Sequence, residues 1–71
     1  MNTTVTVEKN IYITNTQMDK VRGGDLSDVL ILAANMSKNF DGKLDKIEGP
    51  YIDEKQDSLY VAYITKPTRV S

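Results

Sequence analysis

Residues 25–40 read DLSDVLILAANMSKNF, and this stretch decides the fold because it is the clearest element in the chain. Its apolar residues recur every three to four positions, which is the spacing of a helix that packs one side on a core. That stripe consists of Leu26, Val29, Leu30, Ala33, Met36 and Phe40. Asp25 is suited to the N-cap and Gly42 to a left-handed residue after the last turn, so we expect one helix between them.

Two apolar residues of this helix do not belong to the stripe. At about 100° per residue, Leu32 lies on one shoulder of the stripe and Ile31 lies inside the polar half. Residues 43–52 could cover a shoulder of the helix, or another protein chain could contact these side chains. We favour the second interpretation, because an exposed apolar patch on a domain this small usually marks an interaction site.

The strongest strand lies at residues 59–65, which read LYVAYIT. Leu59, Val61 and Tyr63 share one side, and Tyr60, Ala62 and Ile64 share the other. Such a continuous apolar run is typical of a strand that is covered on both sides. Pro67 is expected to end the strand, which leaves residues 67–71 as a flexible tail after a single domain over residues 1–66.

Residues 3–16, TTVTVEKNIYITNT, are rich in β-branched residues and predict extended structure. Val5, Val7, Ile11 and Ile13 share one parity, and Lys9 interrupts the series. One interpretation is a single long strand with Lys9 near an edge. The other is a hairpin whose loop is residues 8–10, which also keeps the four apolar residues on one face. We prefer the hairpin because its loop places Asn10 where a left-handed residue is needed, and Asn tolerates that conformation.

The remaining segments connect these elements. Residues 17–24 are predicted to be a connection, which ends in two glycines. Gly49-Pro50 is predicted to interrupt regular structure before a polar turn at residues 54–57. The order is therefore strand–strand–helix–strand–strand. It predicts the α+β class, with about four strands in a small antiparallel sheet and one helix packed on one face.

Composition excludes several classes of activity. The chain of 71 residues has no His, Cys or Trp and a net charge of −1. Without His or Cys, the usual nucleophilic and acid–base arrangements cannot be built, so we expect no enzyme, no cofactor and no metal site. Residues 39–48 lack the ligand spacing of a calcium loop. Absent cysteines and the lack of a signal-like or membrane-spanning segment lead us to expect a cytoplasmic protein.

Two charged motifs have simple structural interpretations. Arg22-Gly23-Gly24 precedes a helix, but Asp25 and Asp28 would repel a phosphate there, so we expect a turn. The acidic residues Asp53, Glu54 and Asp57 are expected to form a solvated hairpin tip.

The tyrosines suggest a binding surface. They are Tyr12, Tyr51, Tyr60 and Tyr63. We expect a non-enzymatic interaction module that associates with itself or sterically blocks a larger protein, using Ile31 and Leu32 together with the sheet face opposite the helix. The contact surface on that face would lie around Tyr12, Tyr60 or Tyr63. The alternatives are a weak single-stranded nucleic-acid binder that stacks bases on this face and a structural subunit of a larger assembly.

Overall fold

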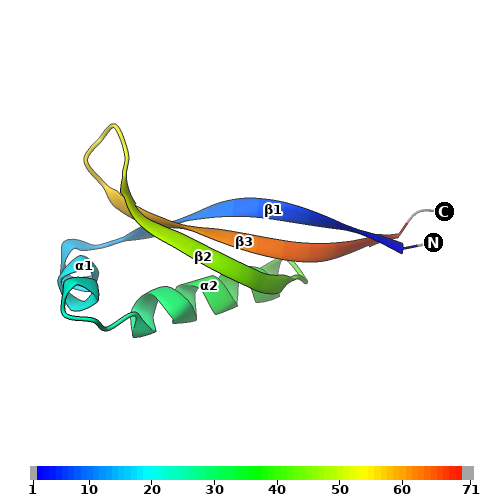
Figure 1. The fold of residues 1–71 in the computed structure, drawn as a ribbon, viewed down its shortest axis with the longest axis horizontal. Helices are drawn as coiled ribbons and strands as arrows, with labels where there is room; N and C mark the ends of the chain where they lie inside the picture. Colours follow the sequence, from blue (N-terminus) through cyan, green and yellow to red (C-terminus); the bar gives the residue numbers. More distant parts are fainter. Residues whose placement is uncertain (1, 70–71) are drawn as a thin grey trace.

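The computed structural model describes residues 2–69 and has an α+β fold of two layers (Figure 1). Its elements are β1 (Asn2–Ile13), α1 (Asn15–Arg22), α2 (Ser27–Asn39), β2 (Lys43–Ile52) and β3 (Ser58–Arg69). The three strands form one antiparallel sheet in the order β1-β3-β2. The predicted class is confirmed, but the sheet has three strands rather than about four, and two helices rather than one lie on its covered side.

The expected N-terminal hairpin is wrong, because the segment forms a single strand. β1 is one strand that pairs with β3 without interruption, from Asn2 opposite Arg69 to Ile13 opposite Ser58. Lys9 is accommodated because its ammonium lies 4.4 Å from the centroid of the Phe40 ring, which follows α2. A cation over an aromatic face keeps a half-buried lysine favourable on an otherwise apolar side of a strand.

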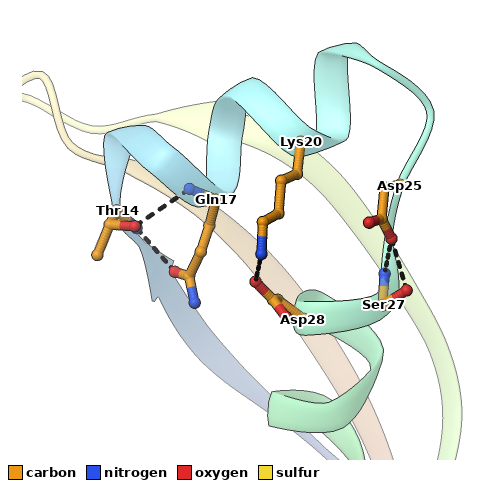
Figure 2. A network of polar contacts seen from close by, with 6 residues as sticks. All are labelled: Thr14, Gln17, Lys20, Asp25, Ser27 and Asp28. Carbon is orange, nitrogen blue, oxygen red and sulfur yellow. Dashed lines mark hydrogen bonds and ion pairs between the residues drawn. The ribbon is translucent and has the colours of Figure 1, made fainter.

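The second correction concerns residues 17–24, which are helical to Arg22 rather than a connection (Figure 2). The Gln17 backbone amide donates to the Thr14 hydroxyl at 3.1 Å, and the Thr14 backbone amide donates to the Gln17 side-chain carbonyl at 2.9 Å. This reciprocal capping box satisfies backbone groups that would otherwise lack partners at the helix start. It explains why a segment with only Met18 buried forms a helix.

Polar contacts join the two helices (Figure 2). Lys20 of α1 donates to the Asp28 carboxylate of α2 at 3.2 Å. Asp25 is not the N-cap, which is Leu26, but its carboxylate accepts hydrogen bonds from the Ser27 hydroxyl and amide. These bonds hold the pKa of Asp25 below its usual value.

The end of α2 differs from expectation at one residue. Asp41 takes the left-handed conformation, with φ of 51°, and Gly42 does not. Gly42 is required for space instead, since a Cβ there would overlap with Cγ2 of Ile64. The chain therefore turns from helix to strand directly against the core.

The core lies between the sheet and the helices. It joins Ile11 and Ile13 of β1, Val29 and Ala33 of α2, and Tyr60 and Ala62 of β3, with Ile64 also fully buried. The expected two-sided covering of β3 is wrong: helices cover one side, and on the other Val61 and Tyr63 are half-buried.

The final strand is longer than expected. β3 does not end at Pro67 but continues to Arg69. β2 pairs with β3 only as far as Thr65, so Pro67 lies where one side of β3 has no neighbouring strand among residues 2–69, and a proline is tolerated at such a position. Residues 70–71 of the expected tail lie outside the described residues.

Candidate functional site

The first candidate surface is the sheet face that no helix covers, which we call the open face. Partners directly opposite one another in a sheet share a face. Tyr12, Leu59 and Tyr51 therefore form one row across the three strands, near the β2–β3 hairpin. Tyr12 is 53% exposed and Tyr51 is 47% exposed, and between them Leu59 is buried. Two large rings thus remain in solvent beside an apolar residue.

The next rows carry the half-buried residues Val61 and Tyr63 in the central strand. Glu8 of β1 and Lys46 of β2 lie on either side of Tyr63, and Glu48 lies beside Val61. The open face consequently has an apolar tyrosine end and a middle that carries charges of both signs.

Tyr60 does not belong to the open face, so that part of the expectation is wrong. It lies opposite Ile11, is only 5% exposed and packs in the core with Val29 and Ala33. β2 bulges closely over its ring at Gly49, where a Cβ would lie 2.8 Å from Cδ2 of Tyr60. Its role is therefore in packing between the sheet and α2.

The structure also separates Ile31 and Leu32 from the tyrosines that were expected beside them. Both are on α2, on the other side of the sheet from Tyr12 and Tyr63. Ile31 points outward and is 58% exposed, whereas Leu32 is partly buried against the core. A single flat surface cannot contact Ile31 and the open face together.

Tyr51 is the member of the open face that the sequence interpretation missed. The sequence did not indicate that Tyr51 lies in a strand, because Gly49-Pro50 was expected to interrupt the strand rather than to form part of it. The turn at 53–57 holds the signal that would have found it. Counting outward from this turn pairs Ile52 with Ser58 and Tyr51 with Leu59, on the same side as Val61 and Tyr63.

A polar cluster fixes the middle of the open face. The Lys46 ammonium lies 4.7 Å from the centroid of the Tyr63 ring and 3.5 Å from Oε1 of Glu48. Hydrogen bonding to the Glu48 carboxylate, followed by burial and the charge of that carboxylate, raises the pKa of Tyr63 to about 12. This bond, followed by the charge of Lys46, lowers the pKa of Glu48. Tyr63 is therefore a neutral hydrogen-bond donor at physiological pH.

The acidic hairpin tip beside Tyr12 is an internally bonded loop. Asp53 accepts hydrogen bonds from the backbone amides of Lys55 and Asp57, each at 2.9 Å. Gln56 takes a left-handed conformation, with φ of 68°. An open hollow lies between this loop and the Tyr12 ring. The carboxylate of Asp53 is thus engaged in holding the turn.

A second hollow lies on the helix side, between α2 and β2. It is lined by Leu26, the N-cap of α2, by Leu30 of α2 and by Leu44 and Ile47 of β2, with Tyr60 also in its wall. Leu26 and Leu30 are about half exposed. This groove adds apolar surface between α2 and the β2 edge of the sheet.

Within residues 2–69, no three acidic side chains come close enough together to hold a metal ion. No helix in that range has the length and apolar character needed to cross a membrane. Comparison with protein-family models, curated proteins and solved structures gave no match. The function is therefore inferred from the residues of this chain alone.

Proposed function

We propose that the chain is a non-enzymatic protein-interaction module that binds a larger protein through its open face and thereby blocks the surface it occupies. The observation that carries this proposal is the row Tyr12–Leu59–Tyr51, in which two half-exposed rings flank a buried leucine. Tyrosine rings bury a large area at low entropic cost and are enriched at the centres of protein interfaces. The complementary partner is a protein surface with an apolar patch at the tyrosine end.

Charges on the open face favour a protein over a nucleic acid. Three tyrosines share this face, as a base-stacking surface would require. However, Glu8 and Glu48 lie on the same face, and Lys46 is already engaged by Glu48 and the Tyr63 ring. Carboxylates beside the rings repel a phosphate backbone, whereas charges of both signs are typical of the rim of a protein interface.

The test is affinity capture in cells of the source organism with three versions of the tagged chain. These are the wild type, the double variant Tyr12→Ala/Tyr51→Ala, and the control Ile31→Ala, which removes a comparably exposed apolar side chain from the other side of the molecule. We expect mass spectrometry to find a protein enriched by the wild type and by the control but lost with the double variant.

Two results would contradict the proposal: no protein enriched by the wild type, or the same protein retained by the double variant. Titration of the purified chain with labelled single-stranded RNA at low and high salt tests the alternative. Salt-sensitive binding that Tyr12→Ala/Tyr51→Ala abolishes would assign the open face to nucleic acid instead.

A further inference from the structure

We infer that β1 is a homodimerisation edge, along which two copies of the chain pair antiparallel to form one continuous six-stranded sheet. The inference concerns a surface other than the open face and stands or falls independently of the function proposed above. Its starting point is that the sheet has two edges, β1 and β2, which are built differently.

The β2 edge is unsuited to pairing with another strand. Its register shifts twice, between Leu44 and Lys46 and between Glu48 and Tyr51, and the second irregularity contains Gly49-Pro50. Bulges and proline are the usual means by which an edge strand is kept from pairing with another chain. β1 has neither feature and follows one register over 12 residues. A regular edge of this length readily accepts a further strand.

The two-stranded end of the sheet explains why a further strand would stabilise the molecule. β2 begins opposite Thr65, so β1 and β3 continue beyond it as a ribbon of two strands (Figure 1). Val5, on this ribbon, is 44% exposed. Two strands alone are marginal in water, and a third strand with an apolar contact is generally needed. Pairing along β1 supplies that strand to each copy.

The charges of β1 disfavour some registers for a second copy. A two-fold axis perpendicular to the sheet keeps the helices of both copies on one side and places one residue of β1 opposite itself. Glu8 or Lys9 at that centre would set like charges opposite each other, which is unfavourable. Thr6 at the centre sets Val5 opposite Val7 of the second copy, and Glu8 opposite Thr4.

This register is also free of obstruction from the helices. With Thr6 at the centre, Asn2 of the second copy lies opposite Asn10, and its strand stops short of α1, which begins at Asn15. The exposed side chains of Thr4, Val5 and Thr6 gain neighbours that they lack within one copy. A second copy is therefore the occupant that this edge fits.

The dimer would place two open faces side by side on the same side of the sheet. Six strands at about 4.8 Å spacing give a surface roughly 29 Å across, twice the width of one copy. Such a platform presents two copies of Tyr12 and Tyr51 to a partner.

The test uses opposite charges at the two-fold centre. Glutamate or lysine at position 6 would meet its own kind in the second copy, so Thr6→Glu and Thr6→Lys should each weaken dimerisation about tenfold or more. An equimolar mixture of the two variants should restore it. The control Lys43→Glu changes a charge in the same row but at the other edge of the sheet, and should dimerise as the wild type does.

Sedimentation measures the mass, and circular dichroism confirms that each variant is folded. The inference predicts a wild type of twice the 8.0 kDa chain mass. A wild type of single-chain mass at every concentration would overturn it, as would a dimer that both position-6 variants retain. If only one of the two variants dissociated, the axis would not pass through Thr6, and the stated register would be wrong.

Discussion

The two faces of the sheet are made by the same three strands, yet they differ in what covers them. On the helix side, Ala62 and Ile64 have no exposed surface. On the open face their sequence neighbours Val61 and Tyr63 remain half-buried. The helix side is therefore expected to supply most of the stability of the fold, whereas the open face leaves apolar surface in contact with solvent.

Truncating a side chain should lower the free energy of unfolding more on the covered face than on the open face. Ile64→Ala removes a fully buried side chain, and we expect the free energy of unfolding to fall by about 3 kcal/mol. Val61→Ala, on the half-buried side of the same strand, should cost about 1 kcal/mol because it loses less buried area. Urea denaturation of both variants measures the difference. Equal losses would show that the two faces contribute equally to the core.

The close approach at Gly42 gives the next largest effect. A methyl group there would overlap with Ile64 Cγ2 and lie 3.1 Å from the Thr65 carbonyl oxygen, so Gly42→Ala should lower the free energy of unfolding by about 2 kcal/mol. Gly23→Ala is the matched control, because φ of −83° suits alanine and the nearest atom lies 3.4 Å away. Its thermal midpoint should be unchanged or slightly raised.

The polar cluster of the open face should make a contribution to stability that depends on pH. Tyr63→Phe removes the donor to Glu48, and the pKa of Glu48 should rise toward its ordinary 4.5, as followed by NMR titration. In the wild type this bond contributes stability above pH 4.5, and the contribution is lost as Glu48 is protonated. Because the pKa of Tyr63 is raised from 10.0 to about 12, the contribution is also lost as the pH rises through that interval.

Tyr63→Phe should remove the dependence above pH 10 and weaken the one below pH 4.5, because Lys46 still lowers the pKa of Glu48. Its midpoint at neutral pH should be slightly lower than that of the wild type, since the bond is lost there too. An unchanged Glu48 titration in the variant would show that Lys46, rather than Tyr63, sets the pKa of this carboxyl.

The smallest change in the free energy of unfolding is expected for a substitution on the solvent-facing side of α2. Ile31 is 58% exposed and lies outside the core cluster, so Ile31→Lys should change the free energy of unfolding by no more than about 0.5 kcal/mol. Leu32→Lys, at the neighbouring half-buried position, should cost more because Leu32 packs against the core. A large loss for Ile31→Lys would mean that this side chain is buried in solution, by a second copy or another contact.

The sequence predicts the elements whose signals are local. The stripe in residues 25–40 is observed as α2, and the apolar run at 59–65 lies within β3. The length of β1 is not a local property: it is set by 12 residues of pairing with β3, which is distant in the chain, and this pairing outweighs the turn signal at residues 8–10. The α1 helix was predictable in principle from the capping box of Thr14 and Gln17.

The candidate site was predictable only in part. Parity already separated Tyr60 from Tyr63, but no local signal indicates which of the two sides the helices cover. Tyr12 and Tyr63 lie on the open face, Tyr60 lies beneath α2, and Ile31 faces solvent on the other side. These positions depend on the packing of the helix layer, which only the folded chain defines.

Photo-crosslinking in living cells tests the central claim, that the open face contacts another protein, most directly. A benzophenone amino acid replaces Tyr51 in one variant and Ile31 in the other, and irradiation links each to whatever lies against it. The account predicts a specific protein adduct from position 51 and none from position 31. An adduct from position 31 alone, or none from either position, would contradict it.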